Sequence, residues 1–249
     1  MTVKEFLDYL SQELNRSPRT VISYAEDLYA FEAYFLDKDE GLTWETIDTD
    51  IIRDWMESMV DKGNSPSSVA RRLSAVKGFF KFALAREFIS SDPAHAIRSP
   101  KRSRPLPQFL KENEINDLLD KQAWGDDFNG LRDRLIIMLF YETGVRLAEL
   151  VGMDDEAVNL AGQFIKVTGK GDKQRVIPFG NELKSMIENY VEERNRTVSR
   201  KTEALLVSET GLRIKPDLVQ RIVKENLARF CSLKKKSPHV LRHTFATAM

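Results

Sequence analysis

A proline-rich, basic segment divides the chain into two stretches of helical periodicity, and this division constrains the fold more than any other feature. Four of the nine prolines lie between residues 93 and 107, together with four Arg or Lys side chains and no acidic one. Such a composition is typical of an extended linker. Because 249 residues exceed one average domain, we expect domains at residues 1–92 and 110–249, joined by a linker at residues 93–109.

The first expected domain has the pattern of four helices. Its apolar residues recur three and four positions apart in four blocks, and most of its aromatic side chains fall on these stripes, as core residues do. One helix from Val3 ends at Asn15-Arg16. The other three begin where a capping side chain stands before a helix, at Ser17-Pro18, Asp48-Thr49 and Ser65-Pro66. The sequence therefore predicts a four-helix domain.

The second expected domain is mixed α/β, mostly helical with a small antiparallel sheet. A strongly apolar helix is predicted over residues 131–141. Residues 163–168 alternate as a strand, a glycine-flanked turn follows at residues 169–173, and residues 174–178 return as a second strand. Further helices are expected at about 182–194 and 217–231, with a short extended segment at 205–208 and a last helix from Ser237-Pro238. The whole chain is thus expected to be mainly α.

Charge is segregated along the chain although the formal net charge is zero. Residues 1–60 carry 5 basic and 14 acidic side chains, whereas residues 61–111 carry 11 and 3, and residues 211–249 carry 9 and 2. Two basic segments far apart in sequence are able to line one channel around a polyanion such as DNA. Ordinary solvated helix faces remain the alternative from charge alone.

The candidate DNA-binding residues come from the fourth helix and from the linker. Four basic side chains lie off the apolar stripe of that helix, where they could reach phosphates or guanine edges in a major groove. Four more lie on the linker, which could follow a DNA backbone or be a solvated tether. The eight residues are Arg71, Arg72, Lys77, Lys81, Arg98, Lys101, Arg102 and Arg104.

Candidate phosphate-binding residues lie in the second domain. Arg146 stands at a helix start, and Glu149, three residues later, is placed to orient it. Lys170 lies between two glycines in the hairpin turn, and His239 and Arg242 share one face near the N-terminus of the last helix, where anions are favoured. A structural ion pair for Arg146 and a solvated turn lysine for Lys170 are the alternatives.

Other chemistries are disfavoured. The turn at residues 169–171 joins two strands and lacks the Walker pattern, which argues against an NTPase. His239 and His243 lie four residues apart, but no cysteine or carboxylate stands near them, so we predict no metal and no cofactor. Cys231 is expected to be a buried thiol. The chain has no secretory leader and no apolar run that could span a bilayer, which predicts a cytoplasmic protein without a membrane partner.

Taken together, these motifs resemble the tyrosine recombinase (phage integrase) family, and most closely its Xer-type site-specific recombinases. The resemblance is collinear over nearly the whole chain. Its specific motifs are Thr143-Gly144-x-Arg146-x-x-Glu149-Leu150, Gly169-Lys170-Gly171-x-Lys173 and His239-x-Leu241-Arg242-His243-Thr244. It implies an N-terminal SAM-like domain that binds the core of a DNA site and a C-terminal catalytic domain.

The resemblance also implies a reaction and the residues that carry it. A tyrosine attacks a DNA phosphodiester to give a 3′-phosphotyrosyl link, and the freed 5′-hydroxyl then attacks a partner strand through a Holliday junction, without metal or ATP. Double-stranded DNA carrying a recombination site is the implied partner, bound by a homo- or hetero-tetramer. The implied catalytic residues are Arg146, Lys170, His239 and Arg242, supported by Glu149 and His243.

The tyrosines depart from the family pattern. All six precede Arg242, whereas the resemblance places the nucleophile after Met249. We therefore expect a C-terminally truncated recombinase that binds DNA but does not cleave it alone. A naturally short DNA-binding regulator on the same scaffold is the alternative, and a helical protein-interaction module is a third. The DNA site, the partner recombinase, and the choice between chromosome-dimer resolution and integration or inversion remain open.

Overall fold

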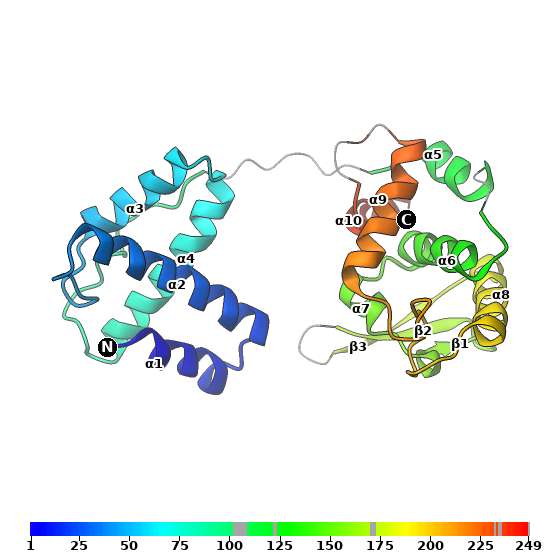
Figure 1. Ribbon diagram of the computed structural model, residues 1–249, viewed down its shortest axis with the longest axis horizontal. Helices are drawn as coiled ribbons and strands as arrows, with labels where there is room; N and C mark the ends of the chain where they lie inside the picture. The colour runs from blue at the N-terminus through cyan, green and yellow to red at the C-terminus, as the bar shows by residue number, and fades with distance from the viewer. Residues whose placement is uncertain (102–108, 122–123, 170–172, 232, 234–235, 249) are drawn as a thin grey trace. The chain divides into compact units, whose positions relative to one another are not determined.

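The computed structural model describes residues 1–101, 109–121, 124–169, 173–231, 233 and 236–248. The chain forms two compact units, Met1–Pro105 and Leu106–Met249 (Figure 1). The first is built of helices, and the second combines helices with a three-stranded antiparallel sheet. The predicted fold class is confirmed. Among the described helices, none has the length and apolar character needed to cross a membrane.

The helices of the first unit begin and end at the signals read from the sequence. α1 (Val3–Asp8) continues into a π-helical turn (Tyr9–Glu13), and the chain leaves it through Asn15, whose φ is +47°. Side chains then cap the next three helices by accepting backbone N–H bonds near their N-termini. The capped helices are α2 (Pro18–Lys38, capped by Ser17), α3 (Thr49–Asp61, capped by Asp48) and α4 (Pro66–Ala85, capped by Ser65).

An aromatic core holds these helices together. Phe31 and Phe35 on α2 pack against Trp44, and the Trp44 ring lies 4.3 Å from the ring of Phe79 on α4, measured between centroids. Phe6 of α1 meets Phe79 edge-on at 5.6 Å. All five rings are at most 5% exposed. These aromatic side chains therefore stabilise the fold and are not platforms on which bases could stack.

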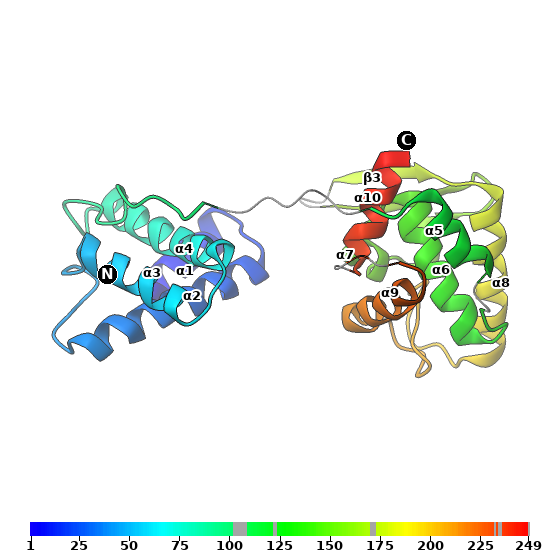
Figure 2. The same cartoon turned by 90° about the horizontal axis from the view of Figure 1, so that it is seen from above.

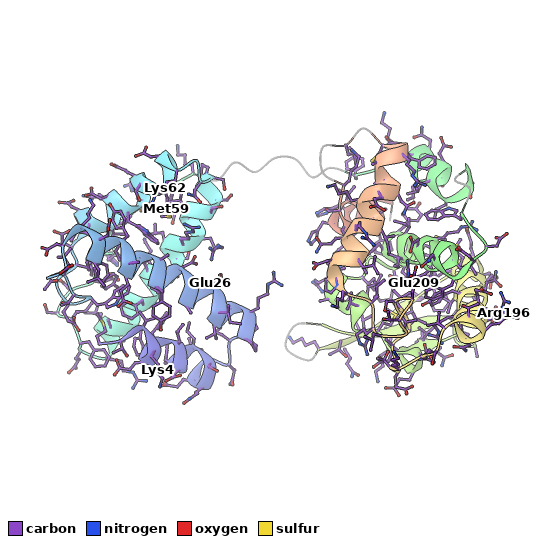
Figure 3. All side chains as sticks on the ribbon, in the orientation of Figure 1. Lys4, Glu26, Met59, Lys62, Arg196 and Glu209 are labelled. Atoms are coloured by element: carbon purple, nitrogen blue, oxygen red, sulfur yellow. The ribbon has the colours of Figure 1, made fainter. Side chains whose placement is uncertain are left out.

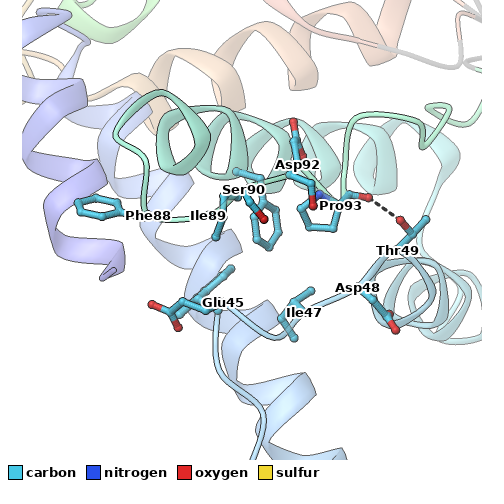
Figure 4. A pocket seen from close by; sticks show the side chains of 12 residues that line it. Glu45, Ile47, Asp48, Thr49, Phe88, Ile89, Ser90, Asp92 and Pro93 are labelled. Atoms are coloured by element: carbon cyan, nitrogen blue, oxygen red, sulfur yellow. Dashed lines mark hydrogen bonds between the residues drawn. The ribbon is translucent and has the colours of Figure 1, made fainter.

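The first part of the expected linker packs against the first unit. Ala94 and Ile97 are buried in its core. The Thr49 hydroxyl donates to the Pro93 carbonyl at 2.8 Å, beside a cavity of about 510 Å³ (Figure 4). Lys77 on α4 donates to the Ile97 carbonyl at 2.5 Å. The segment after Asp92 is thus held to α3 and α4 for five residues before the chain continues toward the second unit.

In the second unit, α6 (Phe128–Thr143) lies between α8 (Asn181–Thr197) and α10 (Pro238–Ala248) in both views (Figures 1 and 2). Its apolar residues point in all directions and are mostly buried, because the helix is covered on several sides. The other α-helices among the described residues of this unit are α5 (Glu112–Asn116), α7 (Leu147–Val151) and α9 (Pro216–Phe230). A π-helical turn (Asp117–Lys121) follows α5, and a 3-10 turn (Asp155–Ala157) precedes the sheet.

The sheet has the order β1-β2-β3 and is antiparallel throughout. β2 (Phe164–Thr168) and β3 (Gln174–Pro178) form the predicted hairpin, with Val167 opposite Arg175. β1 (Val158–Asn159) was not predicted from the sequence, because two residues are too few to show an alternating pattern.

An ion pair with a buried guanidinium anchors α8. The Arg194 guanidinium is completely buried and donates to both carboxylate oxygens of Asp155, at 2.8 and 3.0 Å, and to the Leu205 carbonyl at 2.7 Å. Arg200 also contacts Asp155, at 2.8 Å. Asp155 therefore joins α8 to the segment after α7 and to the loop that follows α8.

Candidate functional site

Two arginines meet one buried carboxylate in the second unit. The side chain of Glu149 is 4% exposed and accepts from Arg146 Nη1 at 2.8 Å and from the Arg146 backbone N–H at 2.7 Å. Arg175 donates to both Glu149 oxygens, at 2.7 and 2.8 Å. Together with Arg242, which approaches from α10, these residues form what we call the Glu149 cluster.

The corner between α6 and α7 positions Arg146. Gly144 caps the C-terminus of α6 with a φ of +58°, and a Cβ there would lie 2.5 Å from the ring of Phe245 on α10. Only glycine fits both this backbone conformation and this contact. The chain then enters α7 with Arg146 as the residue before its first turn, and the Arg146 side chain stays 56% exposed. Its guanidinium is therefore both oriented by Glu149 and open to a ligand.

α10 brings Arg242 to the same corner. Arg242 Nη1 donates to the Gly144 carbonyl, two residues before Arg146. Burial lowers the pKa of Arg242, and the charges of Arg146 and Arg175 lower it further while Glu149 opposes them. A guanidinium remains charged nonetheless. The fold therefore brings Arg242 to the corner that holds Arg146, although the two residues are 96 positions apart in the sequence.

The two histidines lie on the same helix as Arg242. His239 is three residues before Arg242, and both His239 and His243 are exposed. Thr244 is buried and fixes the helix, because its hydroxyl donates to the Val240 carbonyl at 3.0 Å and accepts from Leu110 N at 2.9 Å. Within the described residues, no group of three or more His, Cys, Asp and Glu side chains is arranged to hold a metal ion.

Charge in the cluster is strongly unbalanced. Hydrogen bonds from Arg175, then from Arg146, lower the pKa of Glu149 to about 2 against the opposing effect of burial. The hydrogen bond to Glu149 raises the pKa of Arg175 in turn. Glu149 is therefore ionised at neutral pH. Three guanidiniums and one carboxylate give the cluster a net charge of +2, which favours an anionic ligand.

Arg175 is a member of this site that sequence reasoning missed. It lies on β3, where Arg175 and Ile177 are partly buried and their neighbours are exposed. A charged residue on the inward face of a strand needs a buried partner, and that signal was present in the alternation of residues 174–178. The partner was not identifiable from the sequence, because Glu149 lies 26 positions earlier in a different element.

Lys170 lies outside the described residues, but the base of its hairpin is defined. The backbone N–H of Gly169 donates to the Lys173 carbonyl at 2.8 Å, which closes the ladder of β2 and β3. A Cβ on Gly169 would lie 3.5 Å from Glu149 Oε1 and 3.7 Å from Arg175 Nη1. The end of β2 therefore lies beside the Glu149 cluster.

The four basic residues of α4 have different surroundings. Arg71 pairs with the buried carboxylate of Asp27 on α2 and remains 49% exposed. Arg72 donates to the sulfur of Met59, labelled in Figure 3, at 3.4 Å. Lys77 bonds the Ile97 carbonyl, and Lys81 is exposed. Only part of this predicted DNA-binding face is therefore a solvated cationic surface.

The linker residues divide between described and undescribed segments. Arg98 and Lys101 are exposed. Arg102 and Arg104 lie outside the described residues, so their DNA contacts remain a prediction.

Comparison with known proteins gives the family. Residues 3–87 match the model of the phage integrase N-terminal SAM-like domain, and residues 108–249 match that of the phage integrase family. The chain is 36% identical over 250 residues to tyrosine recombinase XerC of Natranaerobius thermophilus, covering 98% of this chain and 83% of that protein. It is 31% identical over 247 residues to tyrosine recombinase XerD of Staphylococcus aureus, with the same coverage of each.

Solved structures share the fold. The crystal structure of XerH site-specific recombinase, bound to a palindromic difH substrate in a post-cleavage complex, superposes with a TM-score of 0.77. The alignment covers 99% of this chain and 73% of that one, at 22% identity. The resemblance read from the motifs is thus confirmed: the chain belongs to the tyrosine recombinase (phage integrase) family and is related to its Xer-type recombinases.

Proposed function

We propose that the chain binds duplex DNA at a recombination site and that the Glu149 cluster holds the phosphate at which strands are exchanged. Site-specific DNA recombination is the activity of the family to which the chain belongs. The observation that carries the finer assignment is the approach of Arg242 from α10 to the α6–α7 corner that presents Arg146. Crystal structures of related recombinases with DNA support the choice of ligand.

The proposed roles follow from the chemistry of the side chains. Arg146 and Arg242 donate to the non-bridging oxygens of the phosphate and stabilise the charge that builds up as a fifth oxygen attacks phosphorus. His239 bonds a phosphate oxygen or exchanges a proton with the nucleophile, and Lys170 protonates the departing 5′-oxygen as the P–O5′ bond breaks. Glu149 orients Arg146, and His243 supports the same helix face.

The tyrosines of this chain support a role in binding rather than in attack. Four of the six belong to the first unit. In the second unit, the Tyr190 hydroxyl is fully buried and accepts from Val207 N at 3.2 Å, and Tyr141 packs against the core. We propose that none of the six is the nucleophile, so that these 249 residues hold DNA without forming a phosphotyrosyl bond.

DNA contacts outside the cluster come from the first unit and the linker in this proposal. Lys81, Arg98 and Lys101 are exposed cations suited to the DNA backbone, and Arg102 and Arg104 extend the same basic segment of sequence. Following the implication of the motif resemblance, we propose that the full assembly containing this chain is a tetramer of identical or paired subunits on its site.

Two measurements test the proposal. Binding to duplex DNA is expected to weaken by about 10³-fold between about 50 and 200 mM salt, as for a protein that contacts several phosphates. A nicked duplex that traps phosphotyrosyl intermediates is expected to bind without forming a covalent protein–DNA adduct. Binding that does not depend on salt would contradict the proposed contacts with DNA phosphates. A covalent adduct would show that one of the six tyrosines attacks the DNA.

A further inference from the structure

Arg71 on α4 is held in place by a buried carboxylate on α2. Its Nη1 and Nη2 atoms donate to the two oxygens of Asp27, the Nη2–Oδ1 distance being 2.7 Å, and Nη1 also donates to the Ser23 hydroxyl at 2.8 Å. Asp27 is 4% exposed, whereas the Arg71 side chain is 49% exposed. One end of this guanidinium is therefore fixed inside the unit while the rest faces solvent.

The remaining donors form a defined edge. A guanidinium has five N–H groups. Asp27 and Ser23 take both of those on Nη1 and one of those on Nη2. The second N–H of Nη2 and the N–H of Nε have no partner within the described part of the chain, and these two bonds point in the same direction. Arg71 therefore presents a free, parallel pair of donors.

Such a pair matches the O6 and N7 acceptors of guanine in the major groove, and it also matches two phosphate oxygens. Charge distinguishes the two ligands. Asp27 offsets part of the charge of Arg71, which weakens its long-range attraction for a phosphate but leaves its directional hydrogen bonds intact. A preoriented donor pair with reduced charge is better suited to the uncharged edge of a base than a fully charged, solvated side chain would be.

The neighbouring cations on α4 lack this arrangement. Arg72 Nε lies 3.8 Å from Asp27 Oδ1 while its Nη1 bonds the Met59 sulfur, and Lys77 bonds the Ile97 carbonyl. A lysine in any case offers no planar donor pair. Arg71 is thus the residue on this helix whose geometry is set in advance.

We propose that Arg71 reads a guanine and that Asp27 is the positioning residue that fixes the edge it presents. This inference rests on the proposed DNA-binding function and adds a source of sequence preference to it. Because the donor pair is oriented before DNA arrives, little conformational freedom is lost on binding. Asp27 accordingly sets the preference for one base, in addition to the general effect of its charge on the affinity for DNA.

The test uses the whole chain and a duplex selected by the wild-type protein from a random-sequence pool. Each guanine of that duplex is replaced in turn by 7-deazaguanine, which lacks the N7 acceptor. At one position, the replacement is expected to weaken wild-type binding by about tenfold. In Asp27→Asn and in Arg71→Lys, the same replacement is expected to weaken binding by less than about twofold.

A matched variant separates positioning from charge. Asp27→Asn removes one negative charge from the first unit, and so does Asp54→Asn, whose carboxylate pairs with exposed Lys38 at 2.7 Å. Asp54→Asn is expected to change affinity for random DNA as Asp27→Asn does but to keep the tenfold 7-deazaguanine effect. Thermal unfolding shows whether Asp27→Asn still folds. If it does not, Arg71→Lys serves as the test, because it keeps a cation beside Asp27.

Three results decide against the inference. A full 7-deazaguanine effect in both Asp27→Asn and Arg71→Lys would show that another residue reads the base. If Arg71→Lys lost the same affinity for the selected duplex as for random duplexes, Arg71 would be a phosphate contact. If the wild-type chain binds no duplex at all, which the salt titration detects separately, the proposed function fails and this inference with it.

Discussion

Replacing Asp155 with alanine is expected to destabilise the second unit by about 3–5 kcal/mol, because it leaves the charge of Arg194 buried without a carboxylate. The Arg194 side chain is 0% exposed, and two of its shortest hydrogen bonds go to Asp155. The Leu205 carbonyl and the Asn195 side chain would remain as partners, but neither carries charge.

The neighbouring residue provides the control. Asp154 pairs with Arg213, and both side chains are 35% exposed, so Asp154→Ala is expected to destabilise by at most about 1 kcal/mol. Hydrogen exchange measured by mass spectrometry resolves the effect by region. Peptides from α8 should exchange much faster in Asp155→Ala, and peptides from α2 and α4 should be unchanged. Equal protection in the two variants would mean that the pair between Arg194 and Asp155 contributes little to stability.

Replacing Glu149 with glutamine is expected to destabilise the second unit by about 3 kcal/mol at pH 7. The pKa of Glu149 is about 2 in the folded chain against 4.5 ordinarily, so the folded state favours the ionised carboxylate. A carboxyl with a lowered folded-state pKa stabilises the fold fully above pH 4.5 and loses that contribution as the pH falls toward 2. The difference between the two pKa values corresponds to about 3 kcal/mol.

The pH dependence is the distinctive part of this prediction. Urea denaturation of the wild type and Glu149→Gln should give a stability gap that is constant above pH 4.5 and shrinks below it. Glu188→Gln removes the same charge from an exposed pair with Lys184 and should run parallel to the wild type at every pH. A Glu149→Gln gap that does not change between pH 7 and pH 3 contradicts the assignment of the low pKa to this carboxylate.

The sequence predicts local features of this fold well. The starts of α2, α3 and α4 are predictable from capping residues, and the β2–β3 hairpin from its alternation and glycine-flanked turn, because the causes lie within a few residues. Contacts between residues far apart in the sequence were predictable only from the resemblance to family motifs. The approach of Arg242 to Gly144 and Arg146 is an example, since nothing local to either segment requires it.

The partners of charged residues were the feature that the sequence predicted least well. The sequence assigned no partner to Arg175 or Arg194, yet each is paired with a carboxylate distant along the chain. Likewise, the sequence placed Arg71 off the apolar stripe of its helix, but it did not identify Asp27 on another helix as the partner of Arg71. A helical or strand pattern indicates which face a residue lies on, and it does not indicate which residue of another element lies opposite.

The central claim is that the Glu149 cluster binds a DNA phosphate, and the affinity of Arg146→Ala for a selected duplex tests it most directly. Arg196→Ala is the matched control, because Arg196, labelled in Figure 3, is 72% exposed and also pairs with a glutamate three positions away. Loss of a charged hydrogen bond to phosphate predicts that Arg146→Ala binds about tenfold more weakly than the wild type, while Arg196→Ala binds within twofold of it. Equal affinities of the two variants would contradict the claim.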